Sequence, residues 1–165
     1  MKRWTSIFAL FLGLVSSTLW ADTQPPMSSA TILVWANEAI VKVYSYDYVN
    51  YGAQLQGVSD YFTVDAWHAY SDSLAKSKML DSVQANKLTV SAVALKPPVI
   101  KDTKGAGSTF QWTVEMPTLV NFDSSANLNK QQKLNVQLVI VTAQAPQGVR
   151  GLAIQSFLAK PMDAK

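Results

Sequence analysis

The residues that most often do chemistry in proteins are few in this chain. His68 is its one histidine, and cysteine is absent, which excludes disulfides, thiolate metal ligands and a cysteine nucleophile. Because no second histidine stands at ligand spacing, a zinc or iron site is not expected. A single histidine in a helical stretch, here between Trp67 and Ala69, is usually structural rather than a general base. The sequence therefore predicts no catalytic residue, no metal site and no cofactor.

The acidic residues and the paired glycines have ordinary structural explanations. Four aspartates lie in or just after a tyrosine-rich stretch: Asp47, Asp60, Asp65 and Asp72. Three of them stand beside expected helix starts or turns, where capping is the usual role of an aspartate. Gly105 and Gly107 form a GxG pattern without the rest of a phosphate-binding signature, so they indicate a hairpin turn.

One loop has features that packing alone does not explain. The segment APQGVRGLAIQSF contains four residues that we take as interface candidates: Pro146, Gly148, Arg150 and Gly151. One interpretation is a hairpin turn that carries a surface arginine. The other is a shaped loop that presents a protein interface, with Arg150 as its polar anchor.

The N-terminus has the pattern of a secretory signal peptide. Two basic residues precede an apolar core at 7–15, which is much shorter than the roughly 20 residues that span a bilayer. We expect residues 1–21 to be a signal peptide, cleaved after Ala21, that directs the chain to the periplasm. The alternative is an uncleaved inner-membrane anchor that carries a periplasmic domain. Residues 22–30 should form a flexible start to the mature chain.

Composition indicates a chain that buries a core. Hydrophobic residues make up 48% of the sequence and charged residues 15%, and the net charge is +3. Without Lys2 and Arg3 the balance is 12 basic to 11 acidic residues, or +1. The lysines are scattered and form no basic run, so a nucleic-acid partner is not expected.

The first helix is predicted over 31–46. Its apolar residues recur at helical spacing: Trp35, Ala39, Ile40, Val43 and Tyr44. Such a stripe buries one face of a helix, and Glu38 with Lys42 forms a favourable i, i+4 pair on the other side. The run YSYDYVNYG that follows fits two structures. Alternation at 44, 46 and 48 suits a strand, whereas spacing at 44, 48 and 51 suits a helical face with a bend near 47–50. We favour the helical face.

Three further helices follow before the sheet. One covers 53–62, and another begins at Thr63, whose hydroxyl can cap an acidic first turn while Tyr61 or Phe62 packs on Trp67. A third covers 78–86. From Leu88 the hydrophobic period changes from helical to two.

Alternating apolar residues predict four strands, near 88–96, 110–122, 134–140 and 151–158, with a turn at 103–108. Hairpin-length loops favour antiparallel pairing, and Trp112 lies on the apolar face of the second strand. The predicted fold class is α+β, with N-terminal helices packed on a curved four-stranded antiparallel sheet.

The spaced aromatic and apolar motifs resemble those of the IcmL/DotI family of the Dot/Icm type IVB secretion apparatus. The resemblance covers residues 32–158, and its most specific parts are the YSYDYVNY run and the RGLAIQ strand. The residues carried over as fold-defining positions are Trp35, Tyr48, Asn50, Tyr51, Thr63, Trp67 and Trp112. The resemblance implies a domain over 31–160, with a C-terminal tail at 161–165.

The family resemblance also implies a fold and a role. The fold is similar to that of VirB-eight-type periplasmic domains, which belong to the nuclear-transport-factor-two-like group. The implied role is non-enzymatic assembly, through homo- and hetero-oligomers with other secretion-system proteins. Core members of the family have a transmembrane helix before this domain, whereas here a short leader precedes it, so we expect a soluble IcmL-like paralogue that serves as an accessory.

An alternative function is a small-molecule-binding or enzymatic domain on the same scaffold, because such folds often enclose a pocket between helices and sheet. A deep pocket lined by polar groups around His68 or Asp47 would favour this alternative. A cavity filled by aromatic side chains would disfavour it. A secreted factor is a third option.

Overall fold

The computed structural model describes residues 27–106, 108–124 and 129–162. The helices are α1 (Ser29–Val43), α2 (Tyr51–Ser59), α3 (Val64–Lys76) and α4 (Met79–Ala85). The strands are β1 (Tyr46–Asp47), β2 (Leu88–Ala94), β3 (Val99–Ala106), β4 (Thr109–Ser124), β5 (Asn129–Thr142) and β6 (Leu152–Pro161). The strands form one antiparallel sheet in the order β1-β2-β4-β5-β6, with β3 paired to β4. The α+β class predicted from the sequence is confirmed.

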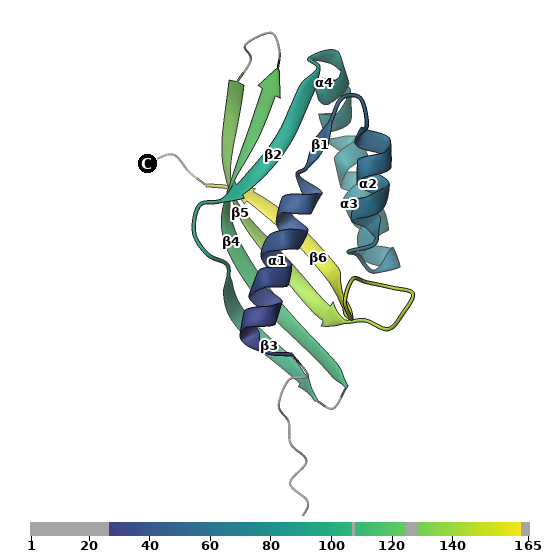
Figure 1. Cartoon of the computed structure of the whole chain (residues 1–165), viewed down its shortest axis with the longest axis vertical. Coiled ribbons are helices and arrows are strands. Elements are labelled where there is room, and N and C mark those ends of the chain that lie inside the picture. The colour runs from purple at the N-terminus through teal and green to yellow at the C-terminus, as the bar shows by residue number, and fades with distance from the viewer. Residues whose placement is uncertain (1–26, 107, 125–128, 163–165) are drawn as a thin grey trace, which may run out of the picture.

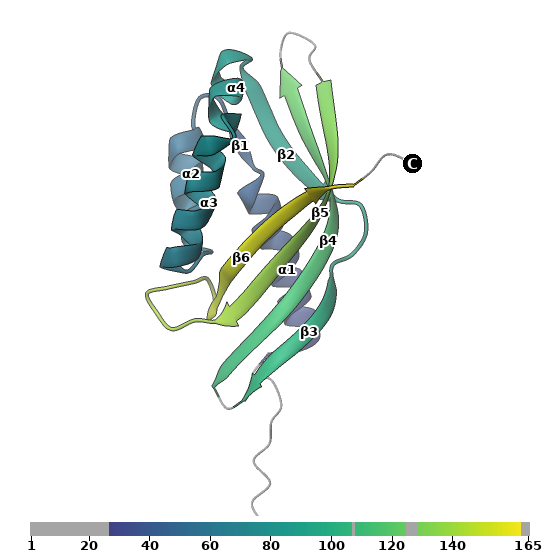
Figure 2. The same cartoon turned by 180° about the vertical axis from the view of Figure 1, so that it is seen from behind.

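The helices gather on one side of a curved sheet. Figures 1 and 2 show α1 lying across the sheet, while α2, α3 and α4 stand together beside it. Within the described ranges, no helix is both long and apolar enough to cross a bilayer. The predicted signal peptide at 1–21 lies outside the described residues, as do 22–26 and 163–165 of the two predicted terminal segments.

Helix α1 forms because its N-terminus is capped and its apolar positions share one face. The Ser28 hydroxyl accepts a hydrogen bond from the Thr31 backbone N–H at 3.2 Å, which caps the first turn. The buried residues are Ile32, Trp35, Ala36, Ala39, Ile40 and Val43. The predicted apolar stripe is therefore confirmed, although the helix begins at Ser29 and ends at Val43 rather than covering 31–46.

The helical interpretation of the tyrosine run is wrong at its centre. Tyr46 and Asp47 form the short strand β1, which pairs with Val90 and Thr89 of β2. The Asp47 carboxylate then accepts the backbone N–H groups of Val49 and Asn50, each at 2.8 Å. These bonds stabilise a turn in place of a helix, because an aspartate side chain can satisfy nearby backbone donors outside a helix.

The start of α3 agrees with its prediction. The Thr63 hydroxyl accepts a hydrogen bond from the Ala66 N–H at 3.4 Å, and the rings of Phe62 and Trp67 lie 5.7 Å apart. This is an N-cap with a hydrophobic contact across the first turn. The same segment is tied to the sheet, since the Ile154 N–H donates to the Tyr61 carbonyl at 2.7 Å and the Thr63 N–H to the Ile154 carbonyl at 2.9 Å.

Strand β4 organises the sheet and the core. Its alternate residues are buried from Phe110 to Phe122, which is the pattern of a sheet with one covered face. Trp112 is 2% exposed, and Trp67 packs against the edge of the same hydrophobic core. The two tryptophans therefore belong to one domain.

The prediction of four strands missed β1 and β3. Strand β3 occupies 99–106, where a turn was predicted at 103–108, and it pairs with the first half of β4. Residues 101–104 have exposed side chains, and Gly105 has none, so no hydrophobic alternation marks them as a strand. The strand is held by backbone pairing to β4, and its charged side chains suit an edge.

We expect Thr63→Ala to lower the free energy of unfolding by about 1 kcal/mol, because the α3 N-terminus loses its side-chain cap. Urea denaturation followed by circular dichroism measures the change. Thr63→Ser keeps the hydroxyl and should retain most of the stability. Equal losses in the two variants would contradict a capping role.

Candidate functional site

The loop between β5 and β6 is closed by backbone hydrogen bonds. The Ala143 N–H donates to the Gly151 carbonyl at 2.9 Å, and the Val149 N–H donates to the Leu152 carbonyl at 2.8 Å. Three residues have positive φ: Gly148 at 78°, Arg150 at 54° and Gly151 at 76°. The left-handed backbone at Arg150 is uncommon for a residue with a side chain.

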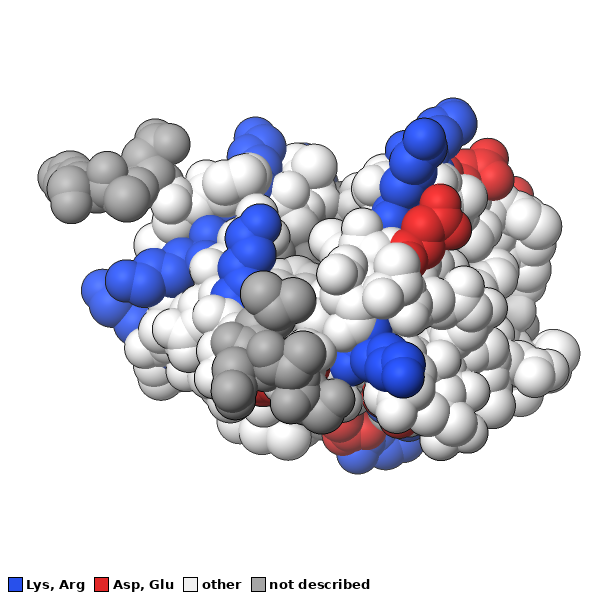
Figure 3. Space-filling model, turned by 90° about the horizontal axis from the view of Figure 1, so that it is seen from above, with Lys and Arg blue, Asp and Glu red and all other residues white. Residues whose placement is uncertain are grey.

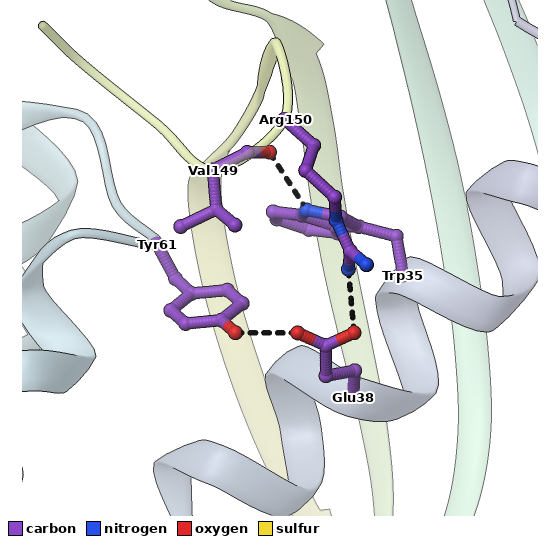
Figure 4. A network of polar contacts seen from close by, with 5 residues as sticks. All are labelled: Trp35, Glu38, Tyr61, Val149 and Arg150. Atoms are coloured by element: carbon purple, nitrogen blue, oxygen red, sulfur yellow. Dashed lines mark hydrogen bonds and ion pairs between the residues drawn. The ribbon is translucent and has the colours of Figure 1, made fainter.

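This loop is fastened to α1 and to the α2–α3 connection by four side chains (Figure 4). The Arg150 guanidinium donates to one carboxylate oxygen of Glu38 at 2.5 Å, and the Tyr61 hydroxyl donates to the other at 2.6 Å. The Trp35 indole N–H donates to the Val149 carbonyl at 2.9 Å, and the rings of Trp35 and Tyr61 lie 5.6 Å apart. We call these five residues, including Val149, the Arg150 corner.

The electrostatics of the Arg150 corner favour a charged Glu38. The hydrogen bond from Tyr61, followed by that from Arg150, holds the pKa of Glu38 below its ordinary value of 4.5. Burial, together with the hydrogen bond to Glu38, raises the pKa of Tyr61 to about 12. The Arg150 and Glu38 side chains are 58% and 42% exposed, so solvent screens their ion pair. The corner is therefore a surface network with one well-oriented carboxylate.

The structure brings some of the predicted residues together and adds two that the sequence did not indicate. Arg150 and Trp35 meet in the Arg150 corner, whereas Pro146 lies exposed on the loop. Glu38 was expected to pair with Lys42, but its ion pair in the described chain is with Arg150. Neither Glu38 nor Tyr61 was an interface candidate, and no local sequence signal connects residues 112 positions apart.

The fold-defining residues occupy different environments. Trp35 and Trp112 are buried, while Trp67 is half-buried. The Tyr51 hydroxyl accepts a hydrogen bond from the Gln84 side chain at 2.8 Å. Of the other three, Thr63 caps α3, and two lie in the turn before α2: Tyr48, which is 40% exposed, and Asn50, which is exposed.

The residues first considered for chemistry do not meet in a pocket. A hollow of about 350 Å³ lies between α3 and β6, and neither His68 nor Asp47 lines it. His68 is exposed on α3, and Asp47 accepts backbone hydrogen bonds in its turn. In the part of the chain that the structure describes, no three histidine or acidic side chains gather where they could hold a metal ion.

Charged side chains are distributed over the surface. On the face shown in Figure 3, lysine and arginine side chains stand in several places, with uncharged surface between most of them and acidic side chains beside some. The ion pairs of the described chain join Lys101 to Glu115, Lys104 to Asp102 and Arg150 to Glu38. The Arg150 pair links distant parts of the chain, and the other two lie on β3 and its β4 partner.

Comparison with protein-family models identifies the family of the chain. Residues 15–161 match the DotI/IcmL model, which is described as a type IVb secretion system inner-membrane complex component. The chain belongs to the DotI/IcmL family. No curated protein matches it at a significant level.

Solved structures agree with this DotI/IcmL membership. An IcmL-like type IV secretion system protein from Legionella pneumophila is 37% identical, with a TM-score of 0.76 over 84% of this chain and 96% of that one. The periplasmic domain of DotI is 34% identical, with a TM-score of 0.77 over 82% and 97%. CagV, a VirB8 homologue from Helicobacter pylori, shares the fold at 10% identity, with a TM-score of 0.62 over 81% and 99%.

The hydrogen bonds of the Arg150 corner predict how the pKa of Glu38 responds to mutation. Its pKa is depressed in the folded protein, so its stabilising contribution is present above about pH 4.5 and is lost as the pH falls through the folded value. We expect Tyr61→Phe to raise the Glu38 pKa toward 4.5, as measured by NMR titration of the carboxyl carbon. Lys42→Gln should leave that pKa unchanged. An unchanged pKa in Tyr61→Phe would show that the Tyr61 hydroxyl does not stabilise the carboxylate.

The loop geometry predicts that Gly148→Ala destabilises the protein by about 2 kcal/mol. An added Cβ would lie 2.3 Å from the Leu152 carbonyl oxygen, at a φ of +78°. Gly52, in α2, has nothing within 4 Å of an added Cβ, so Gly52→Ala should be neutral or stabilise by up to about 1 kcal/mol. Thermal unfolding of the two variants compares them, and an unchanged Tm in Gly148→Ala would contradict the close approach.

Proposed function

We propose that this DotI/IcmL-family chain is a non-enzymatic periplasmic component or accessory of a type IVb secretion system, which acts through protein–protein contacts. The observation that carries the proposal is the similarity, at 34% identity, to the periplasmic domain of DotI over nearly all of that domain. The family model, described as an inner-membrane complex component, supports the secretion-system assignment.

The surface that we propose as an interface is the loop between β5 and β6, residues 143–151, which we call the Arg150 loop. Its backbone is held in one conformation by the hydrogen bonds within the loop and by the Arg150 corner, so a partner would meet an ordered surface. A rigid surface loses less conformational entropy on binding than a mobile one. Pro146 is exposed, and the Arg150 side chain remains more than half exposed while it pairs with Glu38, so both can contact a partner.

Affinity purification of the tagged chain from cross-linked cell envelopes tests this function. We expect other type IVb secretion-system proteins to be recovered with the chain. Recovery of none of them, from cells in which the secretion system is assembled, would contradict the proposal.

A charge swap separates an interface role of Arg150 from its role in holding the loop. Glu38→Arg combined with Arg150→Glu keeps an ion pair between α1 and the loop but reverses the charge at position 150. Because the double variant also removes the acceptor of the Tyr61 hydroxyl, Tyr61→Phe serves as its control. We expect the two variants to have similar Tm values and the double variant alone to lose partner recovery, at least fivefold. Equal recovery with the two variants would show that Arg150 acts only within the chain.

The predicted leader is tested separately, by cell fractionation and N-terminal sequencing. We propose that the mature protein begins at Asp22 and is found in the periplasmic fraction. A protein that keeps residues 1–21 and stays with the inner membrane would favour the anchored alternative over the accessory role.

A further inference from the structure

A second surface lies between α3 and the outer edge of β6. It is a groove of about 350 Å³, and five consecutive residues of β6, 155–159, line it. Successive side chains of a strand point to opposite faces, so five residues in a row indicate that the groove follows the edge of the strand. Figure 2 shows β6 as the last strand of the sheet, with α3 on its outer side. The groove shares no lining residue with the Arg150 corner.

The strand register shows which backbone groups of β6 point into the open. The Met162 N–H donates to the Lys133 carbonyl at 2.9 Å, so the backbone of Met162 faces β5. In an antiparallel ladder, alternate residues face the same neighbour, so Lys160 and Leu158 also face β5. The N–H and C=O groups of Phe157 and Ala159 therefore point away from β5, and within the described chain they have no hydrogen-bond partner.

One residue of β6, Ile154, is already paired on this outer edge by another segment of the chain. Phe62 forms a parallel bridge with Ile154, through the two backbone bonds of Ile154 to Tyr61 and Thr63. At Thr63 the chain turns away into α3. Further along β6, Pro161 lacks a backbone N–H and cannot donate to an added strand. The part of the edge that is open to pairing therefore comprises Phe157 and Ala159.

The other walls of the groove are uncharged, and Tyr44, Tyr46 and Tyr70 form their aromatic part. The rings of Tyr70 and Phe157 lie 5.4 Å apart, and those of Tyr44 and Phe157 lie 6.0 Å apart. The hydroxyls of Tyr44, Tyr46 and Tyr70 make no hydrogen bond with any described residue. Burial raises the pKa of Tyr46 to about 12, so this hydroxyl stays neutral at physiological pH.

The lining residues also include no lysine, arginine, histidine, aspartate or glutamate. A charged side chain that entered the groove would lose hydration and gain no counter-charge. The groove therefore favours an uncharged occupant.

We propose that this groove binds an extended, uncharged peptide segment of a partner protein, which adds to β6 as a further strand. Free backbone N–H and C=O groups at every second residue match an extended polypeptide, because such a chain presents its own groups at the same spacing. The peptide backbone pairs with Phe157 and Ala159, and its apolar side chains contact the aromatic wall. The unpaired tyrosine hydroxyls bond to polar groups of the peptide. This site adds a second interface to the one proposed at the Arg150 loop.

The test begins with a display library of uncharged heptapeptides, selected on the full chain. The best selected sequence is synthesised and its Kd is measured by calorimetry. We expect Ala159→Pro to weaken binding at least tenfold, since it removes an outward N–H and its ring obstructs an added strand. Ala159→Ser keeps the N–H and should bind as the unaltered protein does. Tyr70→Phe should weaken binding roughly fivefold, because it removes one hydroxyl and keeps the ring.

A measurement on the unaltered protein covers the case in which Ala159→Pro fails to fold. The peptide residues fall into two alternating sets, and only one set directs its N–H groups at β6. N-methylation of that set should abolish binding, and N-methylation of the other set should leave binding unchanged. In the bound state the Phe157 and Ala159 amides should exchange more slowly with solvent. Equal effects of N-methylation on the two sets of residues would overturn the proposal.

Three other outcomes would also overturn it. The first is a library that yields no binder, and the second is binding that survives in a folded Ala159→Pro variant. The third is self-association of the chain alone, seen by sedimentation and lost in Ala159→Pro, which would assign the edge to a second copy. Partner recovery through the Arg150 loop is measured independently, so failure of this proposal leaves the proposed function standing.

Discussion

The packing of α1 against the inward face of the sheet is the interaction on which the rest of the structure depends. Its buried residues join those of β4 and β5 in one core, which includes Trp35, Ile40, Trp112 and Leu138. Each fully buried large side chain of this kind contributes about 1.5–3 kcal/mol of burial free energy. Once α1 is fixed on the sheet, its buried face lies on the core, and Glu38, which is half-buried beside that face, reaches the β5–β6 loop.

The Arg150 corner converts this packing into a surface of defined shape. Glu38 is presented by α1, Tyr61 by the connection before α3 and Arg150 by the loop, so three separate segments meet at one carboxylate. The corner is exposed enough that its ion pair is worth little by itself. Its value is geometric, because it holds a loop with three residues of positive φ in one place.

Strand β6 connects the two surfaces that we propose for partners. Its first residues close the Arg150 loop, and Ile154 is paired by the segment that leads into α3. Ile154 pairs with Ile140 and Ser156 with Val139, so Gln155 is an extra residue that forms a β-bulge at this point. Beyond the bulge the outer edge is open and faces an uncharged aromatic wall. A single strand thus supports a polar loop at one end and an unpaired edge at the other.

The sequence by itself determined the parts of this protein that depend on local pattern. The apolar stripe of α1, the Thr63 cap with its Phe62–Trp67 contact, and the alternation of β4 can be identified because hydrophobic periodicity records which face of an element is buried. The same motifs supported the family resemblance. The tertiary structure decided β1 and β3. For β1 the spacing of the tyrosines fitted both a strand and a helix, and the pairing of Tyr46 and Asp47 with β2 decided for the strand. Strand β3 has exposed side chains at 101–104 and is held by backbone pairing to β4, which leaves no hydrophobic pattern. It also decided that Glu38 pairs with Arg150 rather than with Lys42, because a contact between residues 112 positions apart depends on where the packed core places them.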